Sequence, residues 1–232
     1  MKHLIFLFLA LTQCSKEQKE VKILYVKNSP YYSFILETPT TILYSTPYSS
    51  ELKSNTFENK KKIIFENELK KFESYNLISE KKEFENVYVS NVLGETNFEN
   101  NHLFEYDVEI NKGGRVKSNI YYPDEMIGSY EFNIDDLTKD MISKSLNGIP
   151  VKREKKNKKL NNVIILQSKN NTEVFGGNYY INNCQEYSLI LALTNKLLLE
   201  GMNNKKIVKI EKFSTPAKKY IERIPLPPPF LK

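Results

Sequence analysis

The fold class is decided by residues 103–122, LFEYDVEINKGGRVKSNIYY. From Phe104 to Ile110, apolar or aromatic side chains recur at every second position, which is the period of a β-strand with one buried face. Two adjacent glycines end the segment Asn111–Gly114, as in a tight turn, and strand character resumes at Arg115. We therefore predict an antiparallel β-hairpin over residues 103–122.

Other strand-like segments flank this hairpin. They are short, rich in β-branched and aromatic residues, and bounded by Pro, Gly, Asn or Ser. We expect strands at 21–26, 33–37, 40–45, 87–89, 129–134, 163–166 and 207–213. We also expect a second hairpin over 172–181, turning at Gly176-Gly177.

One segment has the signature of an amphipathic helix. Asp135 is a plausible N-cap, the apolar residues that follow lie on one side of a helix, and Asn147-Gly148 is a stop signal. The pattern predicts a short helix near 135–147. Residues 60–79 are also assigned to a helix on the stripe Ile64, Leu69, Phe72 and Tyr75, although 63–65 is also compatible with a strand.

Residues 187–199 fit two structures. As a helix the segment would be apolar nearly all round, and as strands it divides at Thr194–Lys196 into 188–193 and 197–200. We favour the two strands, which continue into 207–213 as a meander. The whole pattern then predicts a mainly β fold of antiparallel hairpins, a small barrel or sandwich, with one or two short helices.

Composition narrows the classes of function. The chain has 232 residues, 40% of them hydrophobic, and a net charge of +6 from 34 basic and 28 acidic residues. That excess is small, so we expect no nucleic acid as a partner. The two cysteines, Cys14 and Cys184, offer no cysteine-rich metal site.

The N-terminal residues have the pattern of an export signal. Met1-Lys2-His3 precedes the apolar run Leu4–Leu11, and the polar stretch 15–20 begins directly after Cys14. Leu11-Thr12-Gln13-Cys14 resembles the lipobox of bacterial lipoproteins, in the relaxed form of spirochaete lipoproteins, since Gln13 replaces the usual small residue. The resemblance implies a signal peptide at 1–13, acylation of Cys14, and a lipidated tether at 14–20 that attaches the protein to a bacterial membrane, facing the periplasm or the cell surface.

We expect three regions after the tether: an N-terminal β-rich region at 21–98, a C-terminal antiparallel β region at 99–216, and a Pro-rich tail at 217–232. Residues 42–52, ILYSTPYSSEL, resemble the opening of bacterial SH3-like modules. That resemblance covers about 35–95 and implies a small barrel with 87–89 as a later strand, but the Gly-Trp pair common in that family is missing.

No catalytic motif stands out. Beyond the signal the single histidine is His102, in a polar setting that suggests a turn. Asp124, Glu125, Asp135, Asp136 and Asp140 leave open a carboxylate-based hydrolase, which needs two acids across a cleft. We see no cofactor motif and predict no catalytic residue and no metal site.

Paired tyrosines are the candidate ligand-binding residues. Neighbouring residues of a strand point to opposite faces, so one of each pair is expected at the surface, where tyrosine suits contact with protein or glycan. The candidates are Tyr121, Tyr122, Tyr179 and Tyr180. We predict a membrane-anchored, non-catalytic envelope lipoprotein that binds an envelope or host partner or has a structural role. The alternatives are a carrier of apolar ligands in a β-barrel cavity and the hydrolase.

Overall fold

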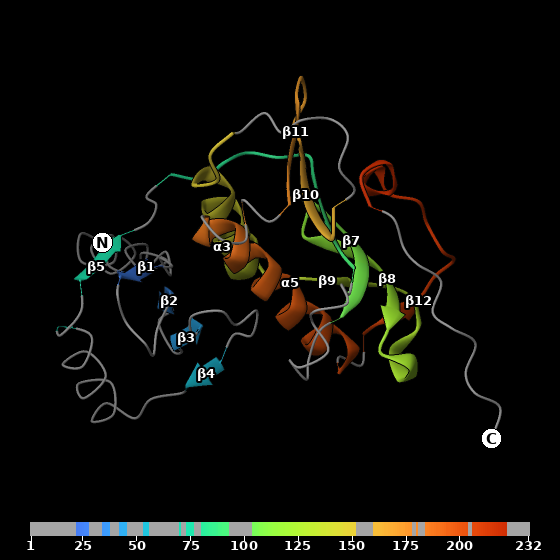
Figure 1. The fold of residues 1–232 in the computed structure, drawn as a ribbon. Helices are drawn as coiled ribbons and strands as arrows, with labels where there is room; N and C mark the ends of the chain where they lie inside the picture. Colours follow the sequence, from blue (N-terminus) through green and yellow to red (C-terminus); the bar gives the residue numbers. More distant parts are fainter. Residues whose placement is uncertain are drawn as a thin grey trace, which may run out of the picture.

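A computed structural model gives the fold (Figure 1). It describes residues 22–27, 34–37, 42–45, 53–55, 70, 73–76, 80–92, 104–151, 160–177, 180, 184–203 and 206–221. Cys14, residues 15–20, His102, Tyr179 and residues 222–232 lie outside these ranges, and so do the predictions made for them.

The larger of two antiparallel sheets has seven strands in the order β11-β10-β6-β7-β8-β9-β12. Its strands are β6 (Asn86–Asn91), β7 (Glu105–Asn111), β8 (Arg115–Tyr122), β9 (Gly128–Asn133), β10 (Asn162–Gln167), β11 (Thr172–Gly176) and β12 (Val208–Lys209). A 3₁₀ turn, η1 (Asp124–Met126), joins β8 to β9. The mainly β fold, with two α-helices among the described residues, agrees with the sequence pattern, and the larger sheet is open rather than closed into a barrel.

The hairpin of β7 and β8 is confirmed. The two strands pair antiparallel, with Ile110 opposite Val116, and the Gly114 amide donates to the Asn111 carbonyl at 2.9 Å. Gly114 has a φ of +84°, a conformation that side chains with a Cβ rarely adopt. The second glycine of the turn is therefore the one that the backbone requires.

Helix α3 (Asp136–Asn147) is also confirmed, with its cap. The Asp135 carboxylate accepts from the Thr138 amide at 2.8 Å, and Gly148 follows the last turn. Its buried apolar side chains, Met141, Ile142 and Leu146, belong to the main core.

The prediction of two strands at 187–199 is wrong. Residues Gln185–Met202 form one helix, α5, which packs against α3 and the sheet. The helix is buried nearly all round, and this explains why its sequence carries no amphipathic stripe. Ile190, Ala192 and Leu193 are all inaccessible or nearly so, which places the helix in the centre of the core.

The second predicted hairpin is wrong as well. β11 pairs with the preceding strand, β10, so the chain turns at residues 168–171 and not at Gly176-Gly177. After that point Tyr180 is helical, and its carbonyl accepts from the Cys184 amide at 2.8 Å. The glycine pair therefore ends a strand and leads toward α5.

The N-terminal strands form a sheet of their own, in the order β4-β3-β2-β1-β5. Its members are β1 (Lys22–Lys27), β2 (Phe34–Glu37), β3 (Ile42–Ser45), β4 (Lys53–Asn55) and β5 (Glu73–Asn76). The first three were expected, whereas β5 falls within 60–79, where a helix was predicted. In Figure 1 this sheet lies on the side of the two helices away from the larger sheet.

β6 contains the strand expected at 87–89, but it pairs with β7 and β10 in the larger sheet. It therefore does not complete a barrel with the N-terminal strands, and the larger sheet begins before residue 99. The alternating residues Val87 and Val89 are fully buried, which ties β6 to the main core.

The face of the larger sheet opposite the helices is crossed by residues 207–221, which we call the C-terminal strap. Within it only Val208–Lys209 pairs with β9, so the strand expected at 207–213 is much shorter. A 3₁₀ turn, η2 (Pro216–Lys219), follows, and Ala217 and Ile221 are buried against Val163 and Ile165 of β10. The tail predicted from residue 217 therefore starts as packed structure.

Candidate functional site

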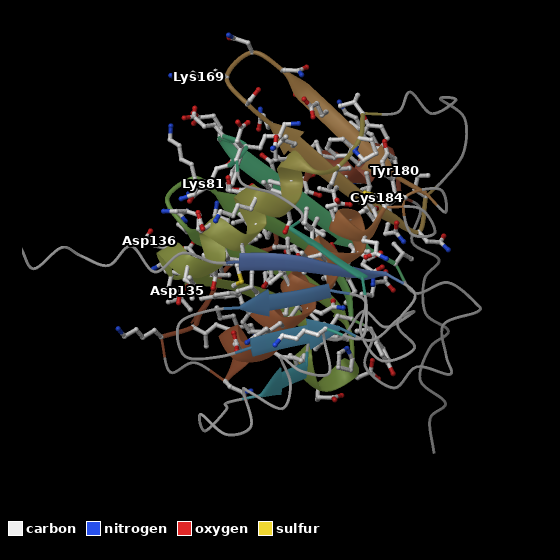
Figure 2. The ribbon with its side chains drawn as sticks, turned by 90° about the vertical axis from the view of Figure 1, so that its left-hand side faces the viewer. Lys81, Asp135, Asp136, Lys169, Tyr180 and Cys184 are labelled. Atoms are coloured by element: carbon white, nitrogen blue, oxygen red, sulfur yellow. The ribbon has the colours of Figure 1, made fainter. Side chains whose placement is uncertain are left out.

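A cleft of about 1280 Å³ opens at one end of the larger sheet. Four segments meet there: residues 81–85 before β6, the β7–β8 turn at Lys112, the first turns of α3, and the β10–β11 turn. In Figure 2, Lys169, Lys81 and Asp136 lie along one edge of the molecule, while Tyr180 and Cys184 lie toward the other side.

Lysines dominate the lining of the cleft. There are six of them against four carboxylates, a net charge of +2. They are Lys81, Lys82, Lys112, Lys139, Lys144 and Lys169. Phe84 and Leu137 are the large apolar residues among the lining side chains. The cleft is therefore open to solvent, and ten of its fifteen lining residues are charged.

Ion pairs fix the position of most of these lysines. Asp140 lies between Lys81 and Lys144, with its carboxylate 3.5 Å from the Lys144 ammonium. Lys112 is 2.7 Å from the carboxylate of Glu85. Lys169, at the tip of the β10–β11 turn, is exposed and has no ion-pair partner among the described residues.

Two further contacts tie residues 81–85 to the rest of the cleft. The Ser143 hydroxyl donates to the Lys82 carbonyl at 2.7 Å, and the Lys82 amide donates to the Ser143 carbonyl at 3.2 Å. The Lys82 ammonium reaches 2.6 Å from Glu173 on β11. One wall of the cleft is thus held to α3 at one side and to the edge strand at the other.

At the rim, Asp136 lies next to a lysine that stabilises its ionised form. Lys139, one helical turn on, donates a hydrogen bond to it at 2.7 Å and attracts it electrostatically. Both effects lower the pKa of the Asp136 carboxyl. Such a group is an acceptor and a fixed negative charge, not a proton donor near neutral pH.

The tyrosines predicted as ligand contacts do not form one site. Tyr121 donates to Asp107 at 3.0 Å and lies under the Lys212 ammonium, on the strap-covered face. Tyr122, at the end of β8, is 38% exposed. Tyr179 lies outside the described residues.

Tyr180 is a core residue, which corrects its assignment as a candidate surface contact. It is fully buried, its hydroxyl donates to the Pro150 carbonyl at 3.0 Å, and its ring stacks on Tyr187 at 5.4 Å. Phe175 meets the same ring edge-on. The strand assumed at Tyr180 was wrong, because the chain is helical at this residue.

The structure also locates the carboxylates that were considered as catalytic groups of a hydrolase. Asp124 and Glu125 belong to η1, at the β8–β9 connection, and Asp135 caps α3. Asp136 and Asp140 share the cleft, each next to a lysine. Among the described residues, no three His, Cys, Asp or Glu side chains gather as ligands for a metal ion.

Comparison with family models, curated proteins and solved structures finds no match to this chain. The cleft lysines were missed in the sequence because they come from four separate segments in a chain rich in lysine. Only the folded arrangement of the turns at one end of the sheet brings them together.

Proposed function

We propose that this chain is a lipid-anchored protein of a bacterial envelope whose folded body acts as a non-catalytic binding module. The observation that carries the proposal is the switch at Cys14 from the apolar run 4–11 to the polar stretch 15–20. In the part of the chain that the structure describes, no helix is long and apolar enough to span a membrane. We propose that acyl chains on Cys14 attach the protein to the membrane.

The body offers little support for a carrier of apolar ligands. The larger sheet is open, and the side chains of α5, among them Ile190 and Leu193, fill the space over it. The cleft is lined by ammonium and carboxylate groups. A carrier instead encloses its ligand with mainly apolar side chains.

A carboxylate-based hydrolase also has little support. Its general acid must hold a proton near neutral pH, which requires a raised pKa. In the cleft, Asp136 and Asp140 each lie beside a lysine, and the pKa of Asp136 is lowered. These charges suit the binding of a ligand better than transfer of a proton.

Membrane attachment can be tested with Cys14→Ser in a bacterium that acylates lipoproteins. The parent protein should incorporate a clickable palmitate analogue and fractionate with membranes, and the variant should do neither. Cys184→Ala is the matched control, since Cys184 is 3% exposed and has no part in anchoring. A Cys14→Ser protein that still takes up the label, or stays in the membrane fraction, would disprove the anchor.

A further inference from the structure

We propose that the lysine-lined cleft binds an anionic glycan, a sugar chain that carries carboxylate, phosphate or sulfate groups. The inference rests on the proposed function, which makes the body a binding module, and it names the ligand class and the residues. Its basis is the pattern of charge in the cleft: exposed ammonium groups from three segments, at Lys81, Lys112 and Lys169, share the cleft with carboxylates and neutral hydrogen-bonding groups.

Three lysines of the cleft present their ammonium groups to solvent. Lys81 and Lys112 have side chains that are 55% and 64% exposed, and Lys169 projects from the β10–β11 turn. Their carboxylate partners lie deeper, since Asp140 is 13% exposed and Glu85 33%. Exposed ion pairs of this kind contribute little to stability, so an incoming anion can share or replace the carboxylate at small cost.

The carboxylates point to a sugar rather than to a bare anion. Glu83, Glu85, Asp136 and Asp140 line the same cleft, so a compact polyphosphate would meet four negative charges among the lysines. A glycan suits this mixture, because its anionic groups pair with ammonium while its hydroxyls donate hydrogen bonds to carboxylates. Ser168 and Asn170, in the β10–β11 turn, add neutral hydrogen-bonding groups.

Size and shape agree with an extended ligand. The cleft, at about 1280 Å³, exceeds the roughly 300–1,000 Å³ typical of pockets for small molecules. It is open to solvent, and its cations span from α3 to the tip of a hairpin. A chain of several sugar units would reach lysines on separate segments at once.

The test uses the full-length protein in nonionic detergent and three polymers of one backbone: dextran, carboxymethyl dextran and dextran sulfate. We expect both anionic polymers to bind and neutral dextran not to. The triple variant Lys81→Gln/Lys112→Gln/Lys169→Gln should weaken binding about tenfold or more, since each exposed charge contact contributes roughly a factor of two to five in affinity.

The matched control is Lys209→Gln/Lys218→Gln/Lys219→Gln. It removes the same charge from three exposed lysines of the strap, outside the cleft. We expect this triple variant to change affinity by less than about threefold, because distant exposed charges are largely screened at physiological salt. Thermal unfolding of both variants should match the parent, which shows that the fold is intact.

Three results would overturn the proposal: equal losses in the two triple variants, binding of neutral dextran as tight as of the anionic polymers, or displacement of carboxymethyl dextran by tripolyphosphate at equal charge concentration. The last would identify a phosphate site. Membrane retention is scored separately: the cleft variant should remain anchored, so loss of glycan binding and loss of the Cys14 anchor are distinguishable.

Discussion

The two faces of the larger sheet are covered in different ways. On one face, α3 and α5 pack apolar side chains against Val87, Val108 and Ile164, and all of these are buried. On the other, the C-terminal strap runs along the sheet (Figure 1), and its middle part is held by hydrogen bonds to Asn119 and Ser129. A helix supplies a continuous apolar surface, whereas an extended segment of this sequence supplies mainly backbone groups.

Asn119 holds the strap to the sheet through its side chain. Its side-chain amide donates to the Phe213 carbonyl at 2.8 Å, and its oxygen accepts from the Phe213 amide at 3.4 Å and the Ser129 hydroxyl at 2.7 Å. A single side chain thus pairs with the strap as a neighbouring strand would. Apolar contact is made at the two ends of the strap, by Ile207 against the main core and by Ala217, Tyr220 and Ile221 near β10. The comparison predicts a robust helical face and a strap that opens more easily.

The largest effect should come from the helical face. Ile190→Ala removes a fully buried side chain from the middle of α5 and should lower the free energy of unfolding by about 2–5 kcal/mol in urea titrations. Leu199→Ala, on the same helix but 46% exposed, is the control and should change it by about 0.5 kcal/mol. Equal losses at both positions would mean that α5 is not packed in the core.

A smaller loss is expected on the strap-covered face. Asn119→Ala leaves the Ser129 hydroxyl and the Phe213 backbone without their partner and should cost about 1–3 kcal/mol. Trypsin should then cut after Lys212 faster than in the parent. Asn133→Ala, an exposed asparagine at the end of β9, should leave both the stability and the cleavage rate unchanged. If Asn119→Ala is cut no faster, the strap is held elsewhere.

The elements that could be predicted from the sequence are those that depend on neighbouring residues. The β7–β8 hairpin and the cap at Asp135 depend on residues within a few positions of one another, so their signals are local. α5 was mistaken for strands because it is buried on most sides, and a helix in that position loses the periodicity that identifies it. The pairing partner of β11 depended on which turn the chain uses, and the glycine pair pointed to the wrong one.

The candidate site was less predictable than the fold. The contacts of Asn119 with Phe213 join residues 94 positions apart, and the cleft assembles lysines from Lys81 to Lys169. Neither the Asn119–Phe213 contacts nor the cleft can be recognised from a pattern of neighbouring residues. Tyr180 was a candidate contact because one of two adjacent tyrosines in a strand is expected at the surface, whereas the chain is helical at Tyr180 and its side chain is buried.

Removing the N-cap of α3 should lower the free energy of unfolding by less than the two changes above. Asp135→Ala removes the acceptor of the Thr138 amide and should cost about 1 kcal/mol. Asp136→Ala, next along the chain and with its side chain 96% exposed, should cost less. Because Lys139 lowers the pKa of Asp136 below its ordinary value of 3.8, the small contribution of Asp136 is present above that pH and is lost as the pH falls further. Urea titrations at neutral pH and in acid check both statements.

The last prediction concerns the order in which the two faces open. Cys184, at the start of α5, is 3% exposed, and burial raises the pKa of its thiol to about 12, so at pH 8 it should react with a thiol reagent only when the helical face opens. Lys212 on the strap is exposed, and cleavage after it requires only that the strap leave Asn119 and Tyr121. In Cys14→Ser protein, where Cys184 is the one remaining thiol, we expect cleavage after Lys212 to begin at lower urea than labelling of Cys184. Coincident onset would show that strap and helices open as one cooperative unit, and the contrast between the two faces would then be one of chemistry and not of stability.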